Sequence, residues 1–219
     1  RNNYQFYSQE LHEQTVKRIH LENDLRRALE QDEFLLYYQP KVDMSGKVIG
    51  MEALIRWQHS KLGMISPGRF IPMAEKTGLI SPISEWVLHT ACLQIREWEE
   101  NNYLSKDATL AVNVSVKQLK QKTFWDTLQR ILSVTELDPR YLELELTESA
   151  IMDHPEETIV LLEKIHQLGA RIAVDDFGTS YSSLNYLKRL PIDAIKIDMS
   201  FVQGIGKDRD DEEIIKVII

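Results

Sequence analysis

Five segments of the chain alternate polar and apolar residues with the two-residue period of a β-strand. In the segment "VIGMEALIRW", Glu52 and Arg56 share one side of the predicted strand, while Ala53 lies with other apolar residues on the opposite side. The same pattern recurs in "TLAVNVS", "YLELELTES", "RIAVDDFG" and "AIKIDMSFV". Each predicted strand therefore has one apolar face and one polar face.

Helical patterns separate these strands. Apolar spacing predicts helices over residues 83–101 and 124–134, Pro155 and Gly169 mark the two ends of a third, and a short one is predicted over 183–187. Helical crossovers between strands indicate parallel pairing, so a closed (β/α)8 barrel and a doubly wound sheet are the two candidates. No glycine-rich dinucleotide loop follows the first strand, which disfavours the doubly wound sheet.

The beginning of the chain differs from this pattern. A charged amphipathic helix comes first, and we interpret it as a linker or as the first helix of the domain, with an apolar stripe that packs on the domain or dimerises. The strands "FLLYYQPKV" and "VIGMEALIRW" follow, with only "DMSGK" between them. Such a short connection favours an antiparallel hairpin.

Composition narrows the function classes. The net charge of the 219 residues is -8 and no basic cluster is present, which disfavours duplex nucleic acid and an anionic membrane as partners. No apolar run approaches the ~18 residues that a membrane span requires. The single cysteine, Cys92, cannot form an internal disulfide, so we expect a reducing, cytoplasmic compartment. This expectation is compatible with a parent protein that is attached to a membrane.

The polar strand faces carry the candidate chemistry. Helices that cover a parallel sheet leave no solvated face, so these polar side chains must point into a barrel or its mouth. Carboxylates buried together need a neutralising charge, and oxygen ligands suit Mg²⁺ or Mn²⁺. The alternative is a set of structural ion pairs with Arg56, Arg171 and Lys196. The candidate metal ligands are Glu52, Asn113, Glu145, Asp175 and Asp176.

Two adjacent aspartates at a strand end suit a two-metal centre. Asp175 and Asp176 can bridge or divide between two cations, which would activate a water and stabilise an in-line phosphoryl displacement. Lys196 on the next strand could hold that water, and Arg56 could bind a phosphate. These features indicate chemistry on a phosphodiester.

Seven segments from Tyr37 to Asp198 carry a resemblance to a known family. They are "YYQPKV", "GMEALIRW", "PGRFIPMAE", "NVS", "ELTES", "DDFGTSYSSL" and "IKID". Together, and in this order, they resemble the EAL domain family of cyclic di-GMP phosphodiesterases. The resemblance implies a TIM-like (β/α)8 barrel with an antiparallel first strand, and hydrolysis of cyclic di-GMP to linear pGpG with Mg²⁺ or Mn²⁺.

The resemblance also implies roles for individual residues. Metal ligands are expected at Glu52, Asn113, Glu145 and Asp175, with Asp176 on the second metal, while Lys196 resembles the lysine that contacts the nucleophilic water. Glu148 resembles the glutamate that holds the loop after "DDFG", which the family uses in metal binding and dimerisation. Gln39, Leu54 and Arg56 resemble positions that line the dinucleotide site, with Arg56 on a phosphate. Our further candidates for substrate lining are Asn113 and Glu75.

Two of these substrate positions have structural alternatives. Gln39 could equally cap its own turn at the strand end. Glu75 lies in "PGRFIPMAEKTG", which we expect to be a loop that lines the substrate mouth, or one that packs Phe70 and Ile71 under the barrel rim.

The chain departs from the family pattern at two places. Ser180 stands where the family usually has glycine, which removes backbone freedom from the loop. A barrel of this class takes about 250 residues, and we expect its C-terminal strands, with one further metal-holding glutamate, to be missing from this chain.

We expect residues 1–8 to be the tail of a preceding GGDEF-like domain, residues 9–30 a linker and first helix, and residues 31–219 the EAL domain. The expected partners are cyclic di-GMP, the adjacent GGDEF or sensor domain, and a second copy of the chain. The main alternative to an enzyme is a receptor module that binds cyclic di-GMP without cutting it.

Overall fold

A computed structural model describes residues 9–105, 107–178 and 188–218. These residues form two compact units: the described residues up to Leu35 with Ile55–Ile83, and Leu36–Leu54 with the described residues from Ser84 onward. The predicted domain tail 1–8, the predicted helix 183–187 and Ser180 lie outside the described residues.

The second unit contains most of a parallel sheet. In the order of the sheet, β1 (Phe34–Val42) neighbours β2 (Val48–His59), followed by β4 (Thr109–Val114), β5 (Leu142–Thr147), β6 (Arg171–Phe177) and β7 (Ala194–Ile197). The pairs from β2 and β4 through β6 and β7 are parallel, as the helical crossovers predicted. Only five residues connect β1 to β2, too few for a parallel crossover, so these strands form the predicted hairpin.

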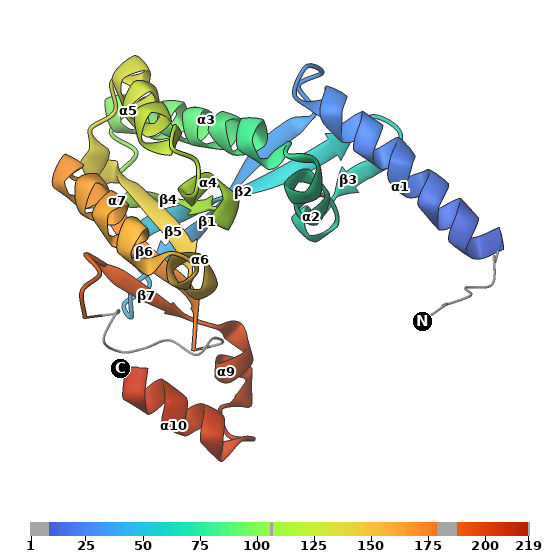
Figure 1. Cartoon of the computed structure of the whole chain (residues 1–219). Helices are drawn as coiled ribbons and strands as arrows, with labels where there is room; N and C mark the ends of the chain where they lie inside the picture. The colour runs from blue at the N-terminus through green and yellow to red at the C-terminus, as the bar shows by residue number, and fades with distance from the viewer. Residues whose placement is uncertain (1–8, 106, 179–187, 219) are drawn as a thin grey trace. The chain divides into compact units, whose positions relative to one another are not determined.

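Helices connect the parallel strands, and α5 and α7 lie on one side of β4, β5 and β6 (Figure 1). The connections are α3 (Ile80–Glu100), α4 (Val116–Leu119), α5 (Phe124–Thr135), η1 (Pro139–Tyr141), α6 (Glu148–Met152) and α7 (Pro155–Leu168). The ends of α7 confirm the prediction, because Pro155 occupies its first turn and Gly169 follows it with a left-handed φ of 103°. This repeated strand and helix order agrees with a TIM-like barrel.

The apolar strand faces form the core of this unit. Leu110, Leu142, Leu144 and Ile172 are at most 1% exposed, and Leu128, Leu162 and Ile165 from the covering helices are fully buried. Apolar burial of this kind stabilises by about 25 cal/mol per Å². It leaves the opposite strand faces for polar side chains.

The first unit has an aromatic core. It contains α1 (Gln9–Ala28), α2 (Pro67–Thr77), β3 (Gly63–Ile65) and the end of β2, which pairs antiparallel with β3. The rings of Phe34, Trp57 and Phe70 lie within 6.1 Å of one another, measured between centroids.

Two sequence predictions were wrong. The segment "PGRFIPMAEKTG" is the helix α2 rather than a loop: Pro67 fits its first turn, and Gly78 ends it in the left-handed conformation with a φ of 78°. The last strand is also shorter than "AIKIDMSFV", because β7 ends at Ile197 and Asp198 caps the helix α9 (Met199–Gly204). The helix after it, α10 (Arg209–Ile218), has three acidic residues in its first turn.

Candidate active site

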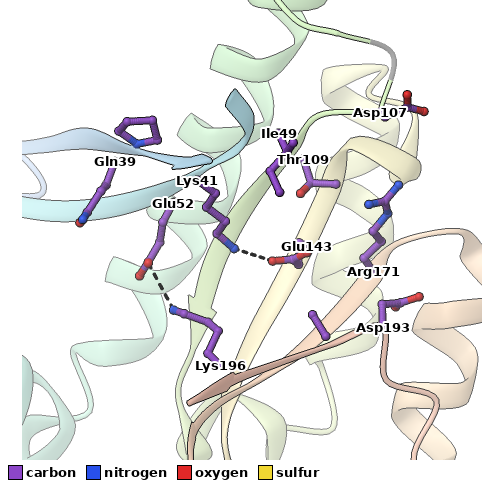
Figure 2. A pocket seen from close by; sticks show the side chains of 12 residues that line it. Gln39, Lys41, Ile49, Glu52, Asp107, Thr109, Glu143, Arg171, Asp193 and Lys196 are labelled. Atoms are coloured by element: carbon purple, nitrogen blue, oxygen red, sulfur yellow. Dashed lines mark hydrogen bonds and ion pairs between the residues drawn. The ribbon is translucent and has the colours of Figure 1, made fainter. Parts of the chain in front are cut away.

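Three acidic side chains from three strands converge on Lys196. The Lys196 Nζ atom lies 3.3 Å from Glu52 Oε2 on β2, 2.8 Å from Glu145 Oε2 on β5 and 3.1 Å from Asp175 Oδ2 on β6. Asn113 on β4 donates to the other Glu52 oxygen at 2.8 Å. Figure 2 shows Glu52 and Lys196 pointing toward each other. The structure therefore brings together most of the predicted set.

The sheet register explains this convergence. Asn113 is the register partner of Glu145 on the neighbouring strand, and Thr147, two residues farther along β5, is the partner of Asp175. Residues two apart on a strand share a face, so these polar residues lie on one side of the sheet. The alternation read from the sequence is thus the cause of the cluster.

Burial and charge act in opposite directions on these groups. Burial raises the pKa of Glu145, whose side chain is 0% exposed, and its hydrogen bonds to Lys196 and Lys41 only partly offset this. Burial also raises the pKa of Glu52, but the Asn113 amide and Lys196 outweigh it, so that this pKa lies below its ordinary value. Burial lowers the pKa of Lys196, yet its three acidic neighbours raise it overall.

Asp175 and Asp176 lie in an irregular part of β6. The pairing of β6 with β7 shifts register between Val174 and Phe177, and Asp176 has a left-handed φ of 53°. This bulge interrupts the alternation that would otherwise send adjacent side chains to opposite faces. Burial, followed by repulsion from Asp175, raises the pKa of Asp176.

Asp198 is an acidic neighbour of this pair that the sequence reasoning missed. It shares a side-chain hydrogen bond with Asp176 and caps α9 by accepting from the Ser200 backbone N–H at 2.8 Å. Its pKa is lowered, first of all by the Ser200 side chain. The signal in the sequence is the helix-cap pattern of Asp198 and Ser200, an acidic residue followed two positions later by serine. It was overlooked because both residues lie in the segment that we predicted to be a strand.

Glu148 lies at the start of α6 and is 2% exposed. Its Oε2 atom accepts a hydrogen bond from the Gly178 backbone N–H at 3.0 Å, directly after β6. The glutamate thus holds the chain just after the paired aspartates, while the rest of that loop, 179–187, lies outside the described residues.

The predicted substrate residues fall in both units. Gln39 and Leu54 belong to the unit with the acidic cluster, and Gln39 is exposed whereas Leu54 is half-buried. Arg56 and Glu75 belong to the other unit, where the Arg56 guanidinium donates to the Ile55 carbonyl at 2.8 Å. Their predicted contact with substrate stays a prediction.

Lys41 on β1 is a second residue that the sequence reasoning missed. Its Nζ atom lies 2.6 Å from Glu143 Oε1 and 2.7 Å from Glu145 Oε1. Glu143 is itself 7% exposed and was not predicted as a site residue. No local signal marks Lys41, because its acidic partners lie more than 100 residues away along the chain.

A cavity of about 640 Å³ adjoins the cluster, with Glu52, Lys41 and Lys196 in its lining (Figure 2). The lining of this cavity also includes Thr109, Glu143 and Arg171, which lie at or near the amino-terminal ends of β4, β5 and β6. Enzymes with parallel barrels place their chemistry at the opposite, carboxyl ends, where Asp175 and Asp176 lie. We therefore do not assign this cavity to the substrate.

The cluster has a surplus of negative charge. Among the described residues, the four carboxylates of Glu52, Glu143, Glu145 and Asp175 contact two ammonium groups, those of Lys41 and Lys196. Converging oxygen donors with excess charge fit a hard divalent cation. Within the described residues, however, no three acidic, histidine or cysteine side chains are already arranged around a metal position. The carboxylates instead surround the Lys196 ammonium.

Family comparison identifies this architecture, since the EAL domain model matches residues 22–219. The chain belongs to the EAL domain family. MucR of Pseudomonas aeruginosa, a bifunctional diguanylate cyclase/cyclic di-GMP phosphodiesterase, is 43% identical over 100% of this chain and 32% of its own length. The cyclic di-GMP phosphodiesterase PdeR of Escherichia coli is 36% identical over 100% of this chain and 33% of its own length.

Solved EAL structures agree with the fold. The MucR phosphodiesterase in complex with c-di-GMP has a TM-score of 0.87 at 46% identity, covering 91% of this chain and 80% of the solved one. The FimX EAL domain of Pseudomonas aeruginosa bound to c-di-GMP has a TM-score of 0.78 at 26% identity, covering 90% and 78%. The present EAL chain spans about a third of the length of the curated relatives given above. None of the described helices has the length and apolar character of a membrane span.

Proposed function

We propose that this EAL chain is a metal-dependent phosphodiesterase that hydrolyses cyclic di-GMP to linear pGpG. The observation that carries the proposal is the convergence of Glu52, Glu145 and Asp175 on Lys196, at 2.8 to 3.3 Å from its Nζ atom. The named activities of MucR and PdeR support the reaction. The structures of MucR and FimX with c-di-GMP support the substrate.

The donor set fits one or two Mg²⁺ or Mn²⁺ ions. Such ions, when bound, lower the pKa of water and stabilise charge on phosphoryl oxygens. The residues that would hold them are Glu52, Asn113, Glu145, Asp175 and Asp176.

The remaining site residues orient the reactants. The Lys196 ammonium has three N–H donors, and the attacking water would accept from one of them in place of one of the three carboxylates. Arg56 binds a phosphate oxygen of the substrate. Gln39, Leu54 and Glu75 line the dinucleotide, and Glu148 fixes the chain at Gly178. The water oxygen bonds to phosphorus, one phosphorus–oxygen ester bond breaks, and the departing ribose oxygen takes up the proton that the water gives up. Opening one of the two phosphodiester linkages yields linear pGpG.

The test is hydrolysis of cyclic di-GMP in Mg²⁺ and in Mn²⁺, with the product identified by mass spectrometry, for the natural sequence and for Glu52→Ala. We expect pGpG from the natural sequence and a loss of at least about 100-fold in turnover in the variant, with an unchanged circular dichroism spectrum. Unchanged turnover in Glu52→Ala would reject the assignment.

A receptor that binds cyclic di-GMP without cutting it is the second candidate. The observation that favours it is the Lys196 ammonium at the centre of the described carboxylates, which are not already arranged around a metal position. Binding of cyclic di-GMP without formation of pGpG, in the presence of either Mg²⁺ or Mn²⁺, would establish that the chain is a receptor.

For the whole protein we propose an adjacent GGDEF or sensor domain, a cytoplasmic site of action and a homodimer.

A further inference from the structure

The Lys41 side chain makes an unusual contact for a strand residue. In the sheet, β2 and β4 lie between β1, which carries Lys41, and β5, which carries Glu143 and Glu145. The Lys41 ammonium nevertheless reaches both glutamates, at 2.6 and 2.7 Å, across the polar side of the sheet. Figure 2 shows the contact with Glu143. Because β1 and β5 are not paired with each other, the contact depends on the curvature of the sheet between them.

The two glutamates need such a charge. They stand two residues apart on β5, so their side chains share one face, and those side chains are only 9% and 0% exposed. Two buried carboxylates this close repel each other strongly unless a cation lies between them. Lys41 contacts both at once.

Lys41 also determines how Glu145 is oriented. The Oε1 atom of Glu145 accepts from Lys41 at 2.7 Å, and its Oε2 atom accepts from Lys196 at 2.8 Å. The carboxylate is thus held at both oxygens, with Oε2 turned toward Glu52 and Asp175, which contact the same lysine. A ligand with one oxygen anchored in this way has little freedom to rotate.

We propose that Lys41 is a positioning residue for metal binding, which acts by neutralising Glu143 and fixing the orientation of Glu145. This inference rests on the proposed metal-dependent function. Groups that hold metal ligands typically change metal affinity by 10- to 100-fold when they are removed. Lys41 touches neither substrate nor the reacting atoms in this role.

The test is Mn²⁺ binding without substrate, measured by isothermal titration calorimetry on the natural protein and on Lys41→Met. We expect about tenfold weaker binding in Lys41→Met and binding within about threefold of the natural protein in Lys41→Arg, which restores the charge and the donors. If the Lys41 ammonium acted only by repelling the metal ion, Lys41→Met would bind Mn²⁺ more tightly than the natural protein, which is the opposite result.

Arg171→Met is the matched control. Arg171 lines the same cavity, so the variant removes one positive charge from it, and no hydrogen bond or ion pair joins Arg171 to Glu145 within the described residues. We expect its Mn²⁺ affinity to stay within about twofold of the natural protein. An equal loss in Arg171→Met and Lys41→Met would overturn the inference, because the effect would then be one of general charge.

Two further outcomes are decisive. If the natural protein and Lys41→Met bind Mn²⁺ equally well, the inference fails and the proposed function stands. If the natural protein binds no Mn²⁺, both fail together. Should Lys41→Met not fold, Lys41→Gln, which keeps donors without the charge, replaces it, with the same tenfold loss expected and equal binding again overturning the inference.

Discussion

The two units satisfy acidic side chains in contrasting ways. In the first unit, Glu33 accepts from the Trp57 indole at 2.9 Å and from the Ser60 backbone N–H at 3.1 Å, so that donors and acceptor are matched. In the second, four carboxylates contact two lysines. Matched polar groups stabilise a fold, whereas an uncompensated surplus of one charge indicates a site that is completed by a ligand.

Replacing the central lysine should give the largest effect. Lys196→Met removes the donor that is proposed to hold the attacking water, and we expect cyclic di-GMP turnover to fall about 1000-fold. The measurement is turnover at saturating substrate, with a thermal melt to show that the variant folds. Turnover within tenfold of the natural protein would mean that the lysine is only a structural counter-charge.

The aromatic core of the first unit should dominate stability instead. Trp57 is 0% exposed and packs against Phe34 and Phe70. We expect Trp57→Ala to lower the free energy of unfolding by about 3–5 kcal/mol. Urea denaturation measures this, and Trp57→Phe, which keeps most of the ring volume, should lose clearly less. Equal losses in the two variants would assign the effect to the indole hydrogen bond and not to packing.

The adjacent aspartates should respond with opposite signs. Asp175 contacts Lys196 at 3.1 Å, so Asp175→Asn should lower the melting temperature in the presence of a metal chelator. The pKa of Asp176 is raised by burial and by neighbouring acids, so its ionised form is unfavourable in the folded state. Asp176→Asn should therefore raise the melting temperature at neutral pH.

The pH dependence checks the sign for Asp176. A raised folded-state pKa of an acid destabilises the fold above that pKa, and the effect disappears below the ordinary value of 3.8. The gain from Asp176→Asn should accordingly be present at pH 7 and vanish as the pH falls toward 3. A gain that is independent of pH would instead indicate relief of the left-handed backbone at φ 53°.

The smallest effect is expected at Glu33. Its pKa is lowered: burial opposes this, but hydrogen bonds from Trp57 and Ser60 prevail. Glu33→Gln weakens those bonds, and we expect a loss of about 0.5–1 kcal/mol at pH 7 by urea denaturation. Because the folded pKa is depressed, the loss should shrink as the pH falls from the ordinary value of 4.5 through the folded pKa. A loss that persists at pH 3 would contradict the hydrogen-bond explanation.

The parts of the fold that were predictable have local signals. The strand β1 has the residues that its apolar run and the following turn indicated, and α7 begins and ends at the predicted proline and glycine. The helix α2 was missed because Pro72 lies inside it, and an internal proline normally argues against a helix. Here the burial of Phe70 and Met73 outweighs that penalty.

The site was predictable to the extent that it depends on alternation. Glu52, Asn113 and Glu145 follow from the two-residue period of their strands. Asp198 and Lys41 do not, for different reasons: Asp198 required knowing where β7 ends, and Lys41 required knowing how far the sheet curves. Long-range geometry of this kind leaves no pattern within a short window of sequence.

Because Lys41 contacts Glu143 and Glu145 from β1, the register between β1 and β2 affects the acidic cluster. A slip of β1 by one residue against β2 would turn Lys41 to the other face of the sheet and bring Pro40, which offers no charge and no donor, into its place. A one-residue deletion within β1 should therefore weaken metal binding at the acidic cluster as much as the substitution of an acidic residue, without altering any of the carboxylates. Variation among relatives at this edge of the sheet should accordingly favour exchanges of side chains over changes in length.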